Sequence, residues 1–517
     1  MPAAALIERA QQPLKNKKVI IMQTIMQTVL TKIALAASLA VALSACGSVG
    51  QDFTAPANVA GVDNGIFRHG AGAADAAQLP KEWWRIYGDA TLDRLEQSAL
   101  QDNPGVKAAG QRLLQALAQS GTARANQSPS VNVSTGISNS RTSANTSQGL
   151  ALGKRSISGN NFSVGGSLSY EVDLLGRVKR MVEAADSQAL AAQAERDGVL
   201  LMLSAQVASN YWQLRGLDAE MAILNGALDT RRESAQLVEA RFNAGLTNEL
   251  DLARTTVELS NAQADLHEVQ RQRQQLENSL ATLTGKPPSA LQLPLAAEPS
   301  SLPLPPAIPV GLPASLLAHR PDLVSSVANL RAANAQVGVA EGAFYPSLQL
   351  TGNFGYASEK LRDLAQGGSR QFSFGPLALS LPIFDAGRNQ SNLDLSKARY
   401  AEAVVNHESK LLTALREVED ALSDVQQRQL QGDAQALSQA AAARAYLVAR
   451  TRYERGISTY LDVIDAQRSS LAADRAAVQI KTQRLLASVA VARSLGAGWQ
   501  PDGELAKLAS APAAKAN

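Results

Sequence analysis

An internal duplication is the feature that most constrains how this chain folds. The segment Arg452–Arg468 (RYERGISTYLDVIDAQR) repeats the pattern of Arg241–Val257 (RFNAGLTNELDLARTTV) at a constant offset of 211 residues. In each copy an apolar-periodic run ends at a glycine, Gly245 or Gly456, which can adopt the left-handed conformation that closes a helix. The Thr or Ser two residues later can cap a second helix, and an Asp falls in the first turn of that helix. We therefore predict two helical hairpins with their tips at these glycines.

The duplication reaches well beyond the two tips. Matched residues differ by 217 positions early in each copy and by 211 later: Pro104 with Pro321, Pro129 with Pro346, and Gly176 with Gly387. This difference places six extra residues in the first copy, in a window that contains the polar stretch 139–154. Because insertions concentrate in exposed connections, we predict a loop there. The two repeats are expected at 81–284 and 314–499.

On either side of each predicted loop, the spacing of apolar residues changes from the helical period to an alternation of apolar and polar residues. Alternation predicts strands at about 130–138 and 161–172 in the first repeat, and at about 347–356 and 371–383 in the second. Gly375-Pro376 interrupts the last alternation, which is typical of a β-bulge. Strands of about ten residues with one apolar face fit a membrane barrel better than a soluble sandwich.

Four strands cannot close a barrel, and open sheet edges are not tolerated in lipid. We therefore expect several chains to share one barrel. Three chains would supply about 12 strands, which is within the range of known membrane barrels.

Two very long helices are predicted at 176–243 and 386–453, each a run of 68 residues without proline. At 1.5 Å per residue each would reach about 100 Å if unbroken. Apolar residues at heptad spacing support coiled-coil packing; in the second helix they are Leu411, Leu415, Val418, Leu422 and Val425. A soluble coiled coil is the plainer interpretation, but it does not explain why such helices follow membrane-type strands. The Pro-rich stretch 285–313 predicts an extended linker, and 500–517 a flexible tail.

The N-terminal part of the sequence has the pattern of a secretion signal. Lysines precede an apolar run from Ile33 to Leu43, which is too short to span a bilayer and the right length for a signal peptide. The run ends in Leu43-Ser44-Ala45-Cys46-Gly47, which resembles the bacterial lipoprotein signal. We predict a signal peptide at 1–45, with Met22 or Met26 as an alternative start.

The lipoprotein resemblance implies cleavage before Cys46, followed by acylation of its thiol and new amine. Cys46 is the only cysteine in the chain, which favours this interpretation over a plain secretory signal with an incidental cysteine. Several acyl chains would anchor the protein stably to outer-membrane lipid. Residues 46–80 lack periodicity and predict a lipid-anchored, extended linker. The Trp pair that follows in Lys81–Tyr87 (KEWWRIY) is more typical of packing against the folded body than of a ligand site.

The composition argues against several functional classes. The net charge is only +3, and Lys and Arg are interleaved with Asp and Glu, so nothing indicates a nucleic-acid partner. Four His and one Cys leave no basis for a metal cluster or a disulfide framework. Phosphate-binding and GxSxG motifs are absent from the sequence. We predict a protein that is not an enzyme and needs no cofactor apart from the covalent lipid on Cys46.

The whole pattern resembles the TolC family of outer-membrane efflux proteins, in its lipoprotein (OprM-like or NodT-type) branch. The marks of this resemblance are the duplication, FYPSL at 344–348, LPIFDAGR at 381–388 and YLDVIDAQR at 460–468. It covers roughly Trp83 to Trp499, and it implies a mainly α fold with membrane β strands. Three chains would form a 12-stranded barrel in the outer membrane and a helical tunnel across the periplasm.

The resemblance also implies a function and partners. The homotrimer would be a gated conduit that receives drugs or other toxic compounds from an inner-membrane pump of the resistance-nodulation-division class. A periplasmic adaptor protein would connect the two. Alternatives are the exit duct of a type I secretion system, a general porin and a lipid-anchored coiled-coil spacer. Long helices and duplicated tips argue against a porin, and the amphipathic strands argue against a spacer.

Residue roles follow from the same resemblance. In the family the constriction of the tunnel uses the Leu, Asp and Arg of the last motif, which are Leu461, Asp465 and Arg468 here. They would form an apolar ring, an acidic ring and a tie between neighbouring helices. An ordinary Asp465–Arg468 pair within one helix is the alternative. The first copy carries Arg254 where the second has Asp465, so we expect Asp251 and Arg254 to partner the second hairpin.

The tips are the expected contacts for the adaptor. In the family the small-residue turns meet the adaptor hairpins, and the matching residues here are Gly245, Leu246, Gly456 and Ile457. Both glycines also serve as helix C-caps. The two roles are compatible, because a glycine turn permits close backbone approach.

Overall fold

The computed structural model describes residues 48–54, 67–69, 79–151, 153, 155–296, 302–308 and 320–509. The predicted signal peptide and Cys46 lie outside the described residues. The chain divides into two compact units, and both repeats contribute to each. We call the first the sheet unit (Met1–Asp52, Thr122–Glu183 and Ala335–Lys397) and the second the helical unit (Phe53–Gly121, Ala184–Asn334 and Ala398–Asn517).

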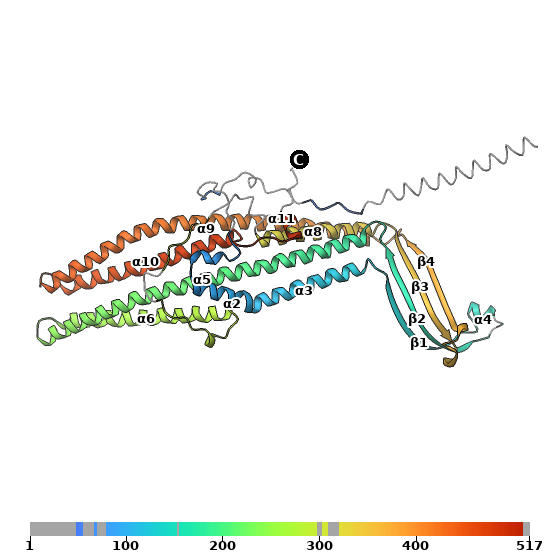
Figure 1. The fold of residues 1–517 in the computed structure, drawn as a ribbon, viewed down its shortest axis with the longest axis horizontal. Coiled ribbons are helices and arrows are strands. Elements are labelled where there is room, and N and C mark those ends of the chain that lie inside the picture. Colours follow the sequence, from blue (N-terminus) through green and yellow to red (C-terminus); the bar gives the residue numbers. More distant parts are fainter. Residues whose placement is uncertain are drawn as a thin grey trace, which may run out of the picture. The chain divides into compact units, whose positions relative to one another are not determined.

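The sheet unit contains a four-stranded antiparallel sheet whose strands follow one another in sequence order (Figure 1). The strands are β1 (Ser130–Arg141), β2 (Ser158–Val172), β3 (Ser347–Ser358) and β4 (Arg370–Ser380). The central pairing of β2 with β3 joins the two repeats, with Val172 opposite Leu348. This sheet confirms the four predicted strands, although β4 ends at Ser380, short of the predicted end at 383.

A bulge lies between β3 and β4, where the alternation of the sequence slips. The register shifts between Leu350, which pairs with Leu377, and Gly352, which pairs with Phe374. Gly375-Pro376 therefore carries the extra residue, as predicted.

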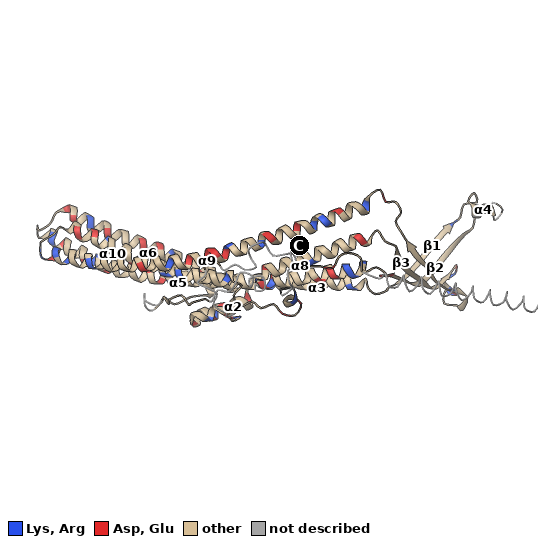
Figure 2. Cartoon of the chain, turned by 90° about the horizontal axis from the view of Figure 1, so that it is seen from above, with Lys and Arg blue, Asp and Glu red and all other residues tan. Residues whose placement is uncertain are grey.

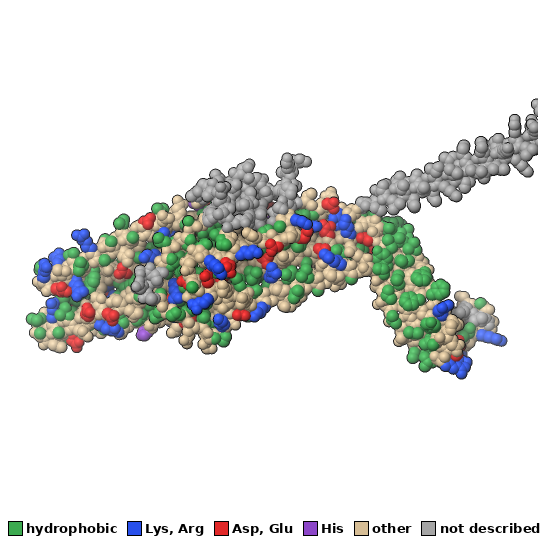
Figure 3. Space-filling view, in the orientation of Figure 1, with side chains coloured by type: hydrophobic (Ala, Val, Ile, Leu, Met, Phe, Trp, Pro, Cys, Tyr) green, Lys and Arg blue, Asp and Glu red, His purple; other side chains and the backbone are tan. Residues whose placement is uncertain are grey.

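The strands expose a band of large apolar side chains, which Figure 3 shows as a concentration of hydrophobic atoms over the sheet. The most exposed of them are Val133, Ile137, Phe372, Phe374, Leu377 and Leu379. A patch of this kind on a soluble surface would be unusual, and it marks a surface that contacts lipid or another chain.

Two hairpins of long helices are the largest helical elements among the described residues. Helix α5 (Arg177–Asn243) is followed by α6 (Glu249–Leu283), and α9 (Arg388–Glu454) is followed by α10 (Tyr460–Ser494). The two outgoing helices are 67 residues each. Before the strands, each repeat has its own helix: α3 (Pro104–Ala125) leads to β1, and α8 (Pro321–Gly342) leads to β3. Figure 2 shows both signs of charge interspersed along the hairpins.

The Trp pair belongs to the core of the helical unit. The turn η1 (Trp83–Tyr87) precedes α2 (Ala90–Asp102), and both of its tryptophans are buried. The Tyr87 ring lies 5.3 Å from that of Trp212, and its hydroxyl is 2.7 Å from the Ser488 hydroxyl. This packing agrees with the predicted role of the segment.

Parts of the segments predicted as extended linkers or tail are packed instead. Phe67 is buried against Val418 and Leu422 of α9, although it lies in the predicted linker 46–80. A short helix, α11 (Glu504–Ala509), forms within the predicted tail, and its Leu505 is buried against α8. Neither contact can be predicted from the sequence, because a single apolar residue in a polar or Gly-rich stretch gives no periodic pattern.

Candidate functional site at the tips of the helical hairpins

The two predicted tips have the same backbone geometry. Gly245 and Gly456 adopt φ angles of 71° and 72°. The amide of Leu246 donates to the Arg241 carbonyl at 2.8 Å, and the amide of Ile457 donates to the Arg452 carbonyl at 2.9 Å. Each glycine amide also donates to the carbonyl three residues before it, that of Phe242 or Tyr453, which completes the Schellman pattern of helix termination. The glycines are thus C-caps in both copies.

Each tip presents an apolar side chain to its surroundings. The residue after a Schellman glycine commonly packs against the last turn of its own helix. Leu246 is instead 76% exposed and Ile457 63% exposed. Both residues were singled out from the sequence, and both are accessible in the helical unit.

The helices that return from the tips begin one residue later than predicted. In the first hairpin the cap is Asn248, whose side chain accepts from the Asp251 amide at 3.0 Å. The hydroxyl of Thr247, the predicted cap, donates to the Asp251 carboxylate at 2.8 Å. In the second hairpin Thr459 forms a capping box with Asp462. The two Asp residues lie in the first turns, as the duplication predicts.

Aromatic side chains near the tips make contacts both within the second hairpin and between the two hairpins. The rings of Tyr453 on α9 and Tyr460 on α10 lie 5.3 Å apart. The Arg241 guanidinium of α5 sits 4.7 Å from the centre of the Tyr453 ring, so it links the first hairpin to the second. Burial of Tyr460 beside Val238 raises the pKa of its phenol to about 12.

The three predicted gate residues of α10 share one side of the helix. Leu461, Asp465 and Arg468 are spaced four and three residues apart, which places them on one face, and all three are exposed. Arg468 does not follow the within-helix alternative. Its Nε donates to Oε1 of Glu258 on α6 at 2.8 Å, and its Nη2 donates to the same oxygen. The contact with Glu258 raises the pKa of Arg468, and the Asp465 charge adds to this rise to a smaller extent.

Glu258 is the functional candidate that the sequence analysis missed. It is 5% exposed, and its second carboxylate oxygen pairs with Nη2 of Arg231 on α5 at 3.1 Å. The Glu258 carbonyl also accepts from Arg231 at 3.0 Å. One carboxylate therefore connects α5, α6 and α10. A signal for it existed, because Glu258 occupies a buried helical stripe otherwise marked by Thr255, Ala262 and Val269.

The pair Asp251 and Arg254 does not reach the second hairpin. Their side chains pair with each other across one turn of α6, with Nη1 and Oδ1 3.7 Å apart. The expectation that they partner the second hairpin is therefore wrong within one chain. Glu258 makes that link instead, because it faces α10 while Asp251 is held by Thr247.

The contact of α10 with the first hairpin repeats every seven residues. Arg475 pairs with Glu220 of α5 at 2.8 Å and with Asp265 of α6 at 3.1 Å. Seven residues further, Thr482 lies against Gly216 of α5, where a Cβ would come within 2.2 Å of its hydroxyl. We call the contacts of Arg468, Arg475 and Thr482 the polar seam.

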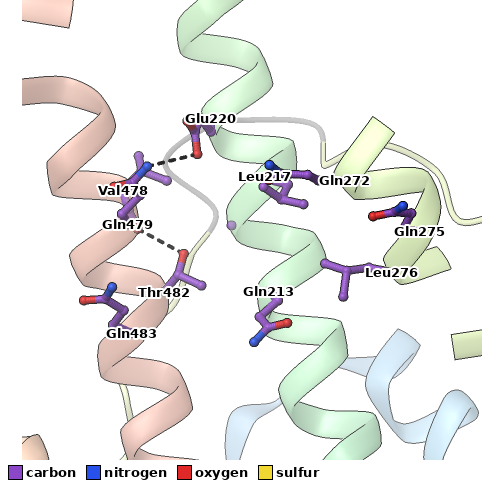
Figure 4. A pocket seen from close by; sticks show the side chains of 11 residues that line it. Gln213, Leu217, Glu220, Gln272, Gln275, Leu276, Val478, Gln479, Thr482 and Gln483 are labelled. Atoms are coloured by element: carbon purple, nitrogen blue, oxygen red, sulfur yellow. Dashed lines mark hydrogen bonds between the residues drawn. The ribbon is translucent and has the colours of Figure 1, made fainter. Parts of the chain in front are cut away.

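A groove of about 430 Å³ lies along this seam (Figure 4). Glutamine side chains dominate its lining: Gln213, Gln272, Gln275, Gln479 and Gln483. Its polar surface has no constellation typical of catalysis. Within the described residues, groups of three or more potential metal ligands do not occur.

Comparison with known proteins identifies the family. Residues 95–286 and 312–497 match the model of the outer membrane efflux proteins. The chain belongs to this family. OprJ, an outer membrane protein of Pseudomonas aeruginosa, is 36% identical over 422 residues, covering 81% of this chain and 86% of that protein. The cation efflux system protein CusC of Escherichia coli is 32% identical over 462 residues, covering 89% of this chain and 97% of that protein.

Solved structures of outer-membrane channels share the fold. The OprN channel superposes with a TM-score of 0.78 at 29% identity, covering 88% of this chain and all of that one. The CmeC channel of Campylobacter jejuni gives 0.80 at 26% identity, covering 89% and 97%. These matches confirm the predicted TolC-like fold and outer-membrane location. In the described part of the chain, no helix has an apolar stretch long enough to cross a bilayer.

Proposed function

We propose that this chain is the outer-membrane channel of a tripartite efflux system. It would export small molecules that an inner-membrane pump of the resistance-nodulation-division class delivers through a periplasmic adaptor. The observation that carries the proposal is the direct joining, in both repeats, of an apolar strand hairpin to a 67-residue helix. A conduit needs a membrane segment and a long extension, and the channel itself needs no chemistry.

In this proposal the pump, and not the channel, selects the compound that is exported. Among the relatives, OpmQ is a pyoverdine export protein, CusC belongs to a cation efflux system, and TtgC belongs to a toluene efflux pump. Relatives of similar identity thus serve chemically unrelated compounds. A wide channel that selects little is consistent with that spread.

A homotrimer follows from the edges of the sheet. The order β1-β2-β3-β4 leaves β1 at one edge and β4 at the other, and both strands expose apolar side chains. Lipid does not tolerate unpaired backbone groups, so β4 of one copy would pair with β1 of the next. Such a head-to-tail contact closes into a ring, and three copies give a barrel of about 12 strands.

The gate in this proposal is formed by Leu461, Asp465 and Arg468 at the periplasmic end. Within one chain, the polar seam holds the second hairpin against the first in the closed state. Because Arg468 is largely exposed, its pair with Glu258 is of the kind that contributes about 1 kcal/mol or less. Separating the hairpins there would break this pair and would also uncover the apolar contact of Val238 on α5 with Tyr460 and Ile464 on α10.

The adaptor would bind the exposed tips. Leu246 and Ile457 are highly exposed apolar side chains there, on glycine turns that allow close approach. Asp251 and Arg254 lie in the turn behind Leu246 and would shape the first tip. An acylated Cys46 would anchor the chain to the outer membrane.

Conductance in planar bilayers tests the function. We expect a small conductance from the wild type and a severalfold increase after Asp465→Ala with Arg468→Ala. High conductance of both proteins would contradict the gate and favour a plain porin. Absence of current from correctly inserted protein would favour a structural spacer.

A further inference from the structure

The segment that follows Cys46 is docked on the sheet unit. We call residues 48–52 the strap. The amide of Val49 donates to the carbonyl of Leu175 at 2.8 Å, in the connection between β2 and α5. The strap is therefore bonded to the unit through its backbone, unlike the extended linker that the sequence predicts there.

One buried arginine holds most of the strap. Arg180, in the first turn of α5, is 2% exposed. Its Nε donates to the Val49 carbonyl at 3.0 Å, and its Nη2 donates to the Gly50 carbonyl at 3.0 Å and to the Asp52 carboxylate at 2.7 Å. A buried guanidinium must have such partners, because an unpaired buried charge is strongly destabilising. Its Nη1 pairs with Glu183 on the same helix at 2.8 Å, so the strap supplies the partners of Nε and Nη2.

Glycines bring the backbones into direct contact at three places. Gly50 adopts a φ of 86°, and a Cβ there would lie 2.7 Å from the Cα of Gly338 on α8. A Cβ on Gly338 would lie 3.1 Å from the Val49 carbonyl, and one on Gly176 would lie 2.9 Å from the Ser48 Cβ. Side chains at these positions would push the strap away, so this surface accepts a closely packed backbone.

The strap lies at a strand–helix junction of the sheet unit and is close to Cys46 in the sequence. Leu175 and Gly176 connect β2 to α5, and Gly338 lies one turn before the end of α8, which leads into β3. Ser48 is two residues after Cys46. Two residues span at most about 7 Å, so a lipid attached two residues before Ser48 would be tethered near this strand–helix junction.

We propose that Gly176, Arg180 and Gly338 form a socket for the strap, and that the socket fixes an acyl group on Cys46 beside the strand–helix junction of the sheet unit. The second half of this inference rests on the proposed lipidation. The anchor is then part of the folded unit and not the end of a free tether. Because Gly176 and Gly338 come from different repeats, the socket is complete only when the two repeats have paired.

Hydrogen exchange of the full-length protein, extracted from membranes, tests the socket. We expect the amide of Val49, in the peptide that contains residues 48–52, to exchange slowly. Arg180→Ala should accelerate its exchange roughly tenfold or more, because charged hydrogen bonds are lost. Gly50→Ala should do the same through steric displacement and leaves Arg180 in place.

Arg177→Ala is the matched control. It removes another guanidinium pair from the first turn of α5, with Glu171 at 2.7 Å, and should leave Val49 protected. Slow exchange in β2 and β3 shows that each variant is folded. The socket is refuted if Val49 exchanges at the unprotected rate in the wild type, or if it stays equally protected in Arg180→Ala and Gly50→Ala.

Mass spectrometry of the N-terminal peptide from the same samples separates the two halves of the inference. An acylated Cys46 together with a protected Val49 supports the whole proposal. An unmodified Cys46 with a protected Val49 overturns the role of the anchor and the proposed lipidation, while the socket stands.

Discussion

Arg468 and Glu258, 210 residues apart in the sequence, are joined by two hydrogen bonds to a single carboxylate oxygen. The other oxygen of that carboxylate forms an ion pair with Arg231. The exposed end of this three-residue chain lies on the proposed gate, and its buried end lies inside the first hairpin. These contacts thus connect the proposed gate to buried residues of the other repeat.

Glu258→Gln should open the channel and weaken the fold together. The substitution keeps the size of the side chain but leaves the buried charge of Arg231 without its partner, which costs about 3 kcal/mol. We expect a severalfold higher conductance in planar bilayers and a lower midpoint in denaturant. The control is Glu268→Gln on the same helix, because Glu268 forms an exposed pair with Arg271. An unchanged conductance for Glu258→Gln would show that the link does not hold the gate.

Two glycines of α5 should respond in opposite ways to alanine. At Gly216 a Cβ meets Thr482 at 2.2 Å, while at Gly226 it meets nothing within 4 Å. Gly226→Ala should stabilise the protein by up to about 1 kcal/mol, the usual gain in a helix. Gly216→Ala should lower the melting temperature, and Thr482→Ala should restore part of the loss. Equal melting temperatures of the two glycine variants would contradict the close approach of α5 and α10.

The exposed tips should be required for adaptor binding but not for folding. Leu246→Asp with Ile457→Asp should weaken binding to the purified adaptor about tenfold or more, because each apolar side chain contributes about 1.5–3 kcal/mol when buried. The melting temperature should stay the same. Leu304→Asp changes an equally exposed leucine in the linker and should leave adaptor binding intact. Calorimetric titration measures both effects, and full affinity of the tip variant would exclude the tips as the contact.

Glu96 should make the stability of the protein depend on pH. Its side chain on α2 is fully buried, and this burial raises its pKa well above the ordinary value. The Ser204 hydroxyl offsets part of the rise, and the charge of Asp93 adds to it. The folded state then binds the proton more tightly than the unfolded state. Stability therefore falls as pH rises from the unfolded pKa through the folded one.

Glu96→Gln should remove this loss, so the gain in melting temperature should be largest at the highest pH and vanish near pH 4. Glu82→Gln, at an exposed pair with Arg85, is the control. Melting curves between pH 4 and pH 9 measure the effect. Parallel curves of wild type and Glu96→Gln would contradict it.

The sequence predicts the elements of this fold well, because their signals are local. Gly245 and Gly456 mark the tips, and the slip at Gly375-Pro376 marks the bulge. The helix caps beyond the tips were predicted one residue early, since a Thr before an Asn and a Ser before a Thr compete for the same position. Such competition is decided by backbone angles that a sequence does not show.

The interactions between repeats could not be predicted in the same way. Glu258 meets Arg468 only because α6 and α10 are brought together in space, and a single charge in an apolar stripe has many potential partners. The sequence predicts a linker where the strap lies, because the contacts of the strap use backbone carbonyls and glycines that carry no hydrophobic period. Lipidation at Cys46, adaptor binding at the tips and gating remain predictions from the family pattern.

The near identity of the two tips has a consequence for symmetry. In a ring of three copies, the glycine turns at Gly245 and Gly456 would present six similar backbones, with Leu246 and Ile457 in alternation. A binding partner with sixfold symmetry could then meet a threefold channel without a mismatch in shape. Only the alternating side chains would distinguish neighbouring tips. The internal duplication would therefore give a threefold ring approximate sixfold symmetry at this end.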